Sequence, residues 1–178
     1  MATDELQLVE PSERLQAAFL DFMDDYRRAG EVFREGDTGE IRRDFAGFLR
    51  RIRNQAASLD LPDGHVPASR WWLVRGGRVI GSVSFRHRLT ESLRDHGGHI
   101  GYGVRPSERG KGCAAAMLAM TLEKVRAFGL RRVLVTCLAD NPASARVIEK
   151  CGGVLDSEGI SRANGQVMRR YWINLASD

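Results

Sequence analysis

The chain has 178 residues, of which 43% are hydrophobic and 28% charged, ordinary values for one soluble globular domain that we expect to span residues 1–178. Its 27 basic and 23 acidic residues leave a net charge of +4, which does not require nucleic acid as a partner and is compatible with a small polyanion. No apolar run approaches the roughly 18 residues that a membrane-spanning helix needs, so no membrane partner is expected.

The N-terminal segment and the cysteines bear on location. Residues 1–15 have neither a basic start nor an uninterrupted apolar core, so the sequence predicts no secretory signal. Three cysteines, Cys113, Cys137 and Cys151, are odd in number and lack the close-pair spacing of a metal site. We therefore expect reduced thiols, a cytoplasmic protein and no metal cofactor.

Two helices are predicted in the first sixty residues. Apolar residues at helical spacing predict the first over residues 12–28, with Gly30 at its end. The second carries an apolar face made of Ile41, Phe45, Phe48, Leu49 and Ile52. Its opposite face is basic and consists of Arg42, Arg43, Arg50 and Arg51. Such a charged helix face is usually solvated.

Strands are predicted from residue 70 onward. "RWWLVRGGRVIGSVSFRHR" (70–88) holds two strands around Gly76-Gly77, a hairpin turn signal. Trp71 and Trp72 are adjacent, so they point to opposite faces of the sheet. "GHIGYGV" (98–104) is a third strand, and its glycines suit a bulge or the close approach of another backbone.

Helices and strands alternate in the last part of the chain. The pattern predicts a helix over 112–128, an apolar strand over 131–138 and a strand over 167–175. Between them, "NPASARVIEKCGG" (141–153) is a helix with Asn141 as its cap, Pro142 at its first position and Gly152 at its end. The order predicts an α/β (α+β) fold with a mixed sheet and helices on both faces.

The segment "VRPSERGKGCAAAML" (104–118) runs from a strand through a charged, glycine-containing turn into a helix, which is typical of an anion site. The ATP-binding P-loop needs G-x-x-x-x-G-K-[ST]. Here Arg105 stands at the position of the first glycine, and Gly112 stands where the hydroxyl residue belongs after Lys111. Both requirements fail, so we reject ATP as the anion.

A dinucleotide is the second alternative. Gly110, Gly112 and Ala115 formally match G-x-G-x-x-A, and Asp140 could imitate the acidic residue that binds the ribose. The preceding strand ends near Val104, however, several residues earlier than such a site requires. The pattern alone is weak evidence, and a dinucleotide stays a minor alternative.

The third alternative fits two motifs. Residues 109–114, "RGKGCA", read R-x-x-G-x-A at a helix start, and this resembles the acetyl-coenzyme A signature of the GCN5-related N-acetyltransferases. "GYGVRPSERGKGCAAAML" and the later "DNPASARVIEKCGG" both look like that family in the right order, and the resemblance covers about residues 71–157. It implies a mostly antiparallel sheet of about six or seven strands, splayed at the fourth and fifth. It also implies acetyl transfer from acetyl-CoA to a primary amine by direct attack in a ternary complex.

The resemblance assigns residues 109–114 to the pyrophosphate of coenzyme A. Backbone amides of Gly110, Lys111, Gly112, Cys113 and Ala114 can point at it from the first helical turn. The two glycines permit positive φ, Arg109 and Lys111 add charge, and Cys113 is a small filler. A helix end contributes only about 0.3–2 kcal/mol. Micromolar affinity needs about 8 kcal/mol, so the pantetheine arm must contribute along the sheet.

The same resemblance gives the glycine-rich strand a role. In the family this strand pairs with the pantetheine as another strand would, which places the backbone of Val104 at the thioester. Its N–H is the candidate oxyanion donor. Asn141 is expected to contact the pantetheine region besides capping its helix, and Ser144, one turn later, is a second candidate.

One position departs from the family pattern. Where this chain has Ile148, many members have a tyrosine, and that tyrosine protonates the departing thiolate. Tyr102 is a candidate replacement, and Cys151 is better explained as a structural thiol. A thiol has a pKa below about 9, so the thiolate can also leave without an acid. The departure motivates an alternative function, a CoA-binding sensor or interaction module with little turnover.

The general base and the acceptor stay open. Glu91 and Glu108 are candidates only by neighbourhood and are expected to be solvated, and His96 and His99 lack a third ligand at metal spacing. The basic helix face lies in the region that walls the acceptor site in the family and could attract an anionic acceptor. The acceptor is a small-molecule or peptide amine, nucleic acid is not expected, and a homodimer is allowed.

Overall fold

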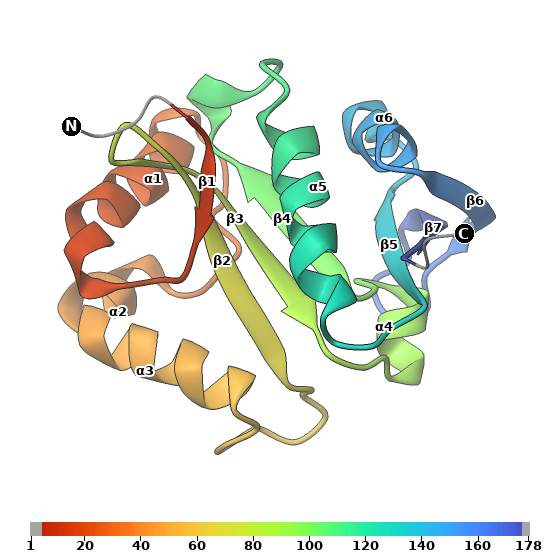
Figure 1. Cartoon of the computed structure of the whole chain (residues 1–178), viewed down its shortest axis with the longest axis horizontal. Helices are drawn as coiled ribbons and strands as arrows, with labels where there is room; N and C mark the ends of the chain where they lie inside the picture. The colour runs from red at the N-terminus through yellow and green to blue at the C-terminus, as the bar shows by residue number, and fades with distance from the viewer. Residues whose placement is uncertain (1–4, 176–178) are drawn as a thin grey trace.

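The computed structural model describes residues 5–175, which form one open mixed sheet with helices on both sides (Figure 1). The described strands are β1 (Gln7–Val9), β2 (Ala68–Arg75), β3 (Arg78–Arg86), β4 (Ile100–Val104), β5 (Arg132–Leu138), β6 (Gly153–Ile160) and β7 (Val167–Asn174). Their order in the sheet is β1-β2-β3-β4-β5-β7-β6. Neighbours are antiparallel except β4 and β5, which are parallel, so the predicted mostly antiparallel architecture is confirmed.

The helices divide between the two faces of the sheet. They are α1 (Gln16–Arg28), α2 (Thr38–Arg43), α3 (Phe45–Ala56), α4 (Glu91–Asp95), α5 (Cys113–Arg126) and α6 (Pro142–Lys150), with short 3-10 turns η1 (Glu13–Leu15) and η2 (Pro106–Glu108). Helices α1, α2 and α3 pack on one face and α5 and α6 on the other, with a hydrophobic core on each side (Figure 1). Helices on both faces, as the sequence predicted, are therefore confirmed.

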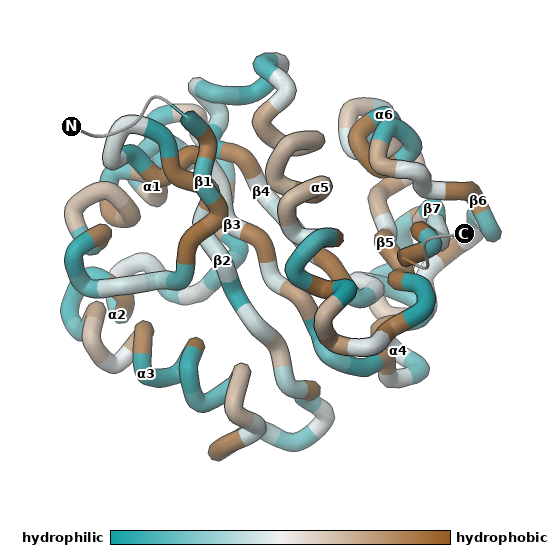
Figure 2. The backbone as a smooth tube through the Cα atoms, in the orientation of Figure 1, coloured by the Kyte–Doolittle hydropathy of each residue, from teal (hydrophilic) through white to brown (hydrophobic). Residues whose placement is uncertain are grey.

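The alternation of side chains along β2 supplies both cores. Trp71 packs with α5 in one core, and its neighbour Trp72 packs with α1 and α3 in the other, stacked on Phe19 at a ring distance of 4.2 Å. Figure 2 shows hydrophobic residues along β3 and β5, which are covered on both sides, and hydrophilic residues in the outer turns. The central strands are therefore buried on both faces between two layers of helices.

Strands β4 and β5 meet at one end only. Their single pair in register is Ile100 with Val135. At this closed end the amide of His99 donates to the Leu134 carbonyl at 2.7 Å, and the Leu134 amide donates to Nδ1 of His99 at 2.9 Å. Gly98 is required here, because a Cβ would lie 2.5 Å from the Leu134 carbonyl oxygen. Within residues 5–175, β4 beyond Ile100 has no strand partner on this side, which confirms the predicted splay.

The structure corrects some predicted elements. The second predicted helix is two helices, because Asp44 leaves helical geometry at φ −139° and its carboxylate accepts from the Gly47 amide at 2.8 Å, capping α3. The first helix begins as a 3-10 turn. Strands β1 and β6 and helix α4 were not predicted: β1 and α4 are short, and β6 is a mostly exposed edge strand without regular apolar alternation.

Candidate active site

The loop between β4 and α5 has the backbone that the sequence predicted. Gly110 and Gly112 both have positive φ, 76° and 79°. Gly112 is the N-cap residue of α5, so its glycine conformation sets the direction in which the helix begins. The first turn of α5 presents unpaired amides here, with only small side chains around them. The segment therefore has the backbone geometry expected of an anion-binding helix start.

A cleft of about 640 Å³ opens in front of this loop. It is lined by the end of β4, by the loop into α5 and by one face of α6, and we name it the α5–α6 cleft. Six of the residues expected to bind cofactor along the loop and strand line it: Val104, Arg109, Gly110, Gly112, Cys113 and Ala114. Asn141 and Ser144 line its far wall. The structure therefore brings these expected residues together around one cavity.

Two cations of the loop are already engaged. Arg109 donates from both terminal nitrogens to Glu31, at 2.7 and 2.8 Å, and from Nε to the Val104 carbonyl at 3.0 Å. The Nζ of Lys111 donates to the Ser107 carbonyl at 2.9 Å and contacts Glu108 at 3.2 Å. Arg109 lines the α5–α6 cleft and Lys111 does not, and both are paired with carboxylates, so in this structure the two side chains serve to shape the loop.

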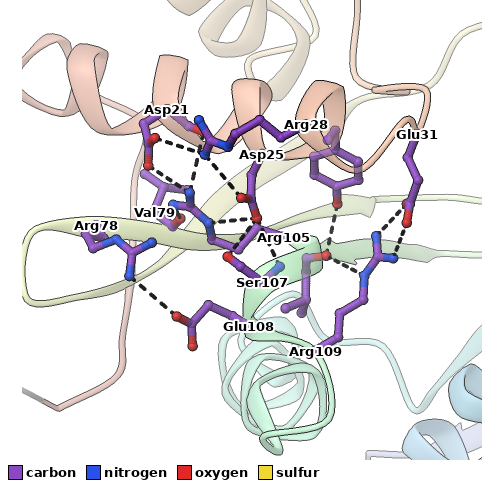
Figure 3. A network of polar contacts seen from close by, with 12 residues as sticks. Asp21, Asp25, Arg28, Glu31, Arg78, Val79, Arg105, Ser107, Glu108 and Arg109 are labelled. Atoms are coloured by element: carbon purple, nitrogen blue, oxygen red, sulfur yellow. Dashed lines mark hydrogen bonds and ion pairs between the residues drawn. The ribbon is translucent and has the colours of Figure 1, made fainter.

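A buried polar network anchors the loop to α1 (Figure 3). Arg105 is 1% exposed and pairs with Asp25 at 3.2 Å and with Asp21 at 2.7 Å. Asp25 also accepts from the amide and the hydroxyl of Ser107 at 3.0 and 2.8 Å. Burial acts to raise the pKa of Asp25, but the Ser107 and arginine contacts outweigh it and hold that pKa well below its usual range. The loop is thus fixed from beneath by charge-assisted hydrogen bonds.

Val104 ends β4 with its amide directed away from β3. The Arg105 amide donates to the Ile80 carbonyl, and the Arg86 amide donates to the His99 carbonyl. Because amides along a strand point alternately to its two sides, the Val104 amide points away from β3 and toward the gap beside β5. The Val104 carbonyl is held by the Tyr26 hydroxyl at 3.2 Å and by Arg109. The Val104 N–H therefore faces the open splay, on a residue whose carbonyl is held in place.

Helix α6 closes the other side of the cleft. Asn141 caps it, since Oδ1 accepts from the Ser144 amide at 3.1 Å, as the sequence predicted. The hydroxyls of Tyr102 and Ser144 lie 2.9 Å apart, joining β4 to α6 across the splay. Burial raises the pKa of Tyr102 to about 12, so its phenol is protonated throughout the neutral range.

A second cleft, also of about 640 Å³, lies over β3 and β4. We name it the β3–β4 cleft, and its walls include residues 31–35 and the side chains of Arg70, Ser82 and Arg86. Both clefts are lined by Glu31, Tyr102, Gly103, Arg109 and Asn141. They are therefore two chambers that adjoin at the middle of β4.

Neither acid named from the sequence as a base is suited to that role. Glu108 was expected to be solvated, but it is 6% exposed and contacts Arg75 at 2.7 Å, Arg78 at 3.4 Å and Lys111. Burial favours a higher pKa, but these cations outweigh it and lower the pKa of Glu108. The prediction failed because loop residues in sequence give no sign of tertiary pairing. Glu91 is exposed on α4 and lines neither cleft.

Other residues named from the sequence have structural surroundings. Ile148 is fully buried in the core under α6, and Cys151 is half-buried with its thiol 3.6 Å from the Ala115 carbonyl. His99 is buried, and burial together with Arg94 and Arg86 lowers its pKa to about 4. His96 lines the β3–β4 cleft. Across residues 5–175, no group of three or more potential ligands is placed to hold a metal ion.

Comparison with known proteins now decides the family. The model of the acetyltransferase (GNAT) domain matches residues 11–154. The chain belongs to the GNAT acetyltransferase family. Membership identifies an acetyl-CoA-dependent N-acetyltransferase and confirms the resemblance seen in the two motifs.

A search of curated protein sequences finds no match. Among residues 5–175, none of the helices is long and apolar enough to cross a membrane.

Solved structures share the GNAT fold at low identity. A ribosomal-protein-S5-alanine acetyltransferase from Vibrio fischeri is 16% identical, with a TM-score of 0.72 over 99% of this chain and 97% of that one. The microcin C7 self-immunity acetyltransferase MccE, in complex with acetyl-CoA and AMP, is 16% identical, with a TM-score of 0.67 over 97% and 93%. A spermidine N-acetyltransferase chimera from Vibrio cholerae and hSSAT is 15% identical, with a TM-score of 0.64 over 96% and 95%.

Sequence reasoning missed the polar residues Glu35, Arg70, Ser82 and Arg86 of the β3–β4 cleft. Glu35 accepts from Arg70 at 2.9 Å and from Ser82 at 2.8 Å, both through Oε2. Arg86 approaches the same cleft from the end of β3. These residues come from three segments far apart in sequence, so spacing alone carried no signal. The only available hint was polar serines at alternate positions of an otherwise apolar strand.

Proposed function

We propose that this GNAT domain transfers the acetyl group of acetyl-CoA to a primary amine by direct attack in a ternary complex. The supporting observation is the pair of clefts that adjoin at Tyr102 and Gly103, one against a helix-start anion loop and one lined by polar side chains. The structural neighbours are named for acetylating spermidine and a ribosomal-protein alanine, both of which are amine acceptors.

In this proposal acetyl-CoA occupies the α5–α6 cleft. The amides of residues 110–114 receive the pyrophosphate at the start of α5. The pantetheine lies along the open edge of β4, where it replaces the missing strand and meets the amides directed into the splay. Asn141 and Ser144 contact it from α6. The thioester then lies near Gly103, at the junction with the β3–β4 cleft.

The chemical step follows from this placement. The neutral amine nitrogen attacks the thioester carbon, and negative charge develops on its oxygen, where the Val104 amide donates a hydrogen bond. The C–S bond breaks and leaves an amide and the thiolate of coenzyme A. Tyr102 donates a hydrogen bond toward the sulfur. Its pKa of about 12 lies some 3–4 units above that of a thiol, which makes full proton transfer uphill by about 5 kcal/mol.

The amine must lose a proton, and Glu35 is the proposed acceptor. Glu31 is occupied through both oxygens by Arg109, whereas Glu35 bonds Arg70 and Ser82 through Oε2 alone. Among residues 5–175 its Oε1 has no hydrogen-bond partner. That oxygen can hold the incoming ammonium group and take its proton directly or through water.

Initial-velocity kinetics tests the proposal. Free thiol is measured while acetyl-CoA and a primary amine are varied together, and the account predicts intersecting double-reciprocal lines, as a ternary complex requires. Parallel lines would instead indicate an acetylated enzyme and contradict direct attack.

One observation favours a second candidate, a CoA-binding module: Ile148 lies in the core and provides no acid. Retained acetyl-CoA binding with no thiol release across amines and peptides would select that module.

A further inference from the structure

The β3–β4 cleft carries more positive than negative side chains. Its charged lining residues are Arg34, Arg70, Arg86, Arg109, Glu31 and Glu35. Glu31 is paired with Arg109 and Glu35 with Arg70. Among the residues that the structure describes, neither Arg34 nor Arg86 has a carboxylate within 4 Å. An occupant of this cleft therefore meets excess positive charge.

Arg86 is the more deeply placed of these two arginines. Among residues 5–175 only its Nη1 is engaged, donating to the carbonyls of Gly97 and Gly98 at 3.1 and 3.2 Å. These contacts fix the guanidinium but do not neutralise it. Its terminal nitrogens lie 3.7 and 3.8 Å from where Gly101 would carry a Cβ, so the bare backbone of β4 makes room for them. The Nε and Nη2 donors are left for a ligand.

A second guanidinium lies close by. Burial and then the charge of Arg70 lower the pKa of Arg86, although arginine stays protonated in proteins. Arg70 and Arg86 thus share one cleft, and of the two only Arg70 is paired there with a carboxylate, Glu35. An arriving anion would relieve this repulsion, whereas a polyamine would add to it.

Resting on the function proposed above, we propose that the acceptor is a small primary amine that carries a carboxylate or phosphate, and that Arg86 binds this anionic group. The Nε and Nη2 donors form a fork that matches two oxygens of either group. Glu35 then faces the ammonium end of the same molecule. A compound with both charges satisfies both sides of the cleft.

Strand geometry limits the length of the acceptor. The Arg86 guanidinium lies over Gly101, and the thioester is placed near Gly103, two residues or about 7 Å further along β4. A guanidinium contact takes about 3 Å of this span. The remainder fits an amine separated from its anionic group by a few bonds, as in a short amino acid or an aminoalkyl phosphate.

Matched acceptors test the idea on the unaltered protein. Thiol release is measured with β-alanine against β-alaninamide, with phosphoethanolamine against ethanolamine, and with spermidine and a C-terminally amidated peptide. We expect kcat/KM to be at least tenfold higher for the anionic member of one or both pairs, and the pair that shows it identifies carboxylate or phosphate. Equal rates within both pairs, or faster acetylation of spermidine or the peptide, would overturn the proposal.

Substitution tests the assigned residue. Arg86→Gln should raise KM for the preferred anionic acceptor roughly 10- to 100-fold, and leave KM for its neutral partner and the acetyl-CoA affinity unchanged. Arg131→Gln makes the same charge change at an exposed residue outside both clefts and should alter nothing. An equal effect of both variants would trace the preference to overall charge and reject the site. If Arg86→Gln does not fold, Arg86→Lys, which keeps the charge and loses the fork, should show a smaller rise in the same KM.

A binding measurement separates this inference from the proposed function. N-acetyl-β-alanine and its amide, or the matching phosphate pair, are titrated calorimetrically into the protein loaded with coenzyme A. Tighter binding of the anion, lost in Arg86→Gln, supports the anion site even if no amine is turned over, in which case only the proposed function fails. Turnover without any anion preference would instead support the proposed function and overturn the anion site.

Discussion

At the scale of single residues, Tyr102 shows how burial limits a side chain's chemistry. Its ring packs against the core between β4 and α6, and its hydroxyl is paired with Ser144. Because burial raises its pKa to about 12, the phenol is a good hydrogen-bond donor and a poor acid. The role proposed for it is therefore to stabilise the departing sulfur rather than to protonate it.

Tyr102→Phe measures that distinction. Loss of one hydrogen bond should lower kcat less than about tenfold and reduce the unfolding free energy by about 1 kcal/mol. Ser144→Ala is the matched control, since it removes the partner of the same hydrogen bond and keeps the phenol. Steady-state kinetics that show a fall in kcat of more than 100-fold for Tyr102→Phe alone would make the phenol an obligatory acid and contradict the account.

His99 couples the closed end of the splay to pH. Its Nδ1 accepts from the Leu134 amide, which requires the neutral ring, and its pKa of about 4 lies below the ordinary 6.5. The unfolded chain therefore binds the proton first, so stability falls as pH drops from about 6.5 to 4, by about 3 kcal/mol in total. Urea unfolding across this range should show the loss, most of it above the pH at which the carboxylates titrate.

His99→Asn provides the control for this pH effect. The asparagine Oδ1 can accept from the Leu134 amide in place of Nδ1, and it does not titrate. The variant should therefore have a flatter stability profile between pH 6.5 and 4.5. A profile identical to that of the parent protein would assign the pH dependence to other groups.

The predictability of site residues depends on whether their role is local. Positive φ at Gly110 and Gly112 and the cap formed by Asn141 follow from chain neighbours, and all three are confirmed. The cleft positions of Glu35 and Arg86 depend on the register of β2, β3 and β4, which no short window of sequence encodes.

At the scale of elements, the polar contacts between α1 and the β4–α5 loop are what hold the loop in place. Arg105 follows directly after Val104 and is buried beneath the loop, where α1 supplies two carboxylates (Figure 3). Charge-assisted hydrogen bonds on a buried guanidinium hold a loop more firmly than exposed pairs do. The position of the Val104 peptide thus depends on a helix about eighty residues earlier in the chain.

Asp25→Asn tests whether these contacts hold the loop. Arg105 would keep the half-exposed Asp21 but lose the charge of its buried partner Asp25, so the unfolding free energy should fall by about 2–3 kcal/mol and acetyl-CoA affinity should weaken. Asp24→Asn is the adjacent control and should cost less than about 1 kcal/mol, since its ion pairs with Arg27 and Arg42 lie at the surface. Equal losses for the two variants in urea titrations would show that the buried network anchors nothing.

Elements are predicted well where the signal is local and strong. The Gly76-Gly77 hairpin, the strand 132–138 and the helix after Asn141 lie where the sequence places them. The split at Asp44 was missed because apolar spacing continues across it, although the aspartate three residues before Gly47 is itself a capping signal. Strand β6 is stabilised by pairing with β7 rather than by burial, and its side chains therefore show no clear pattern.

At the scale of the whole molecule, an open sheet with one splayed pair creates the two adjoining chambers. Helices α5 and α6 line the chamber on one side of β4, and residues 31–35 line the chamber over β3 and β4. Figure 1 shows the order of the helices around the sheet. Both chambers are lined by Tyr102 and Gly103 of β4. This arrangement lets two substrates meet without a covalent enzyme intermediate, which is why direct attack is the proposed route. A homodimer stays a prediction.

The most direct test of the central claim is calorimetric titration of acetyl-CoA into Gly112→Asp and Gly112→Asn. Both side chains enter the same positive-φ position with open space around it, and asparagine and aspartate tolerate that conformation similarly. They differ in one negative charge at the helix start, facing the proposed pyrophosphate. The account predicts at least tenfold weaker binding for the aspartate variant than for the asparagine variant. Binding by Gly112→Asp as tight as that of the parent protein would contradict it.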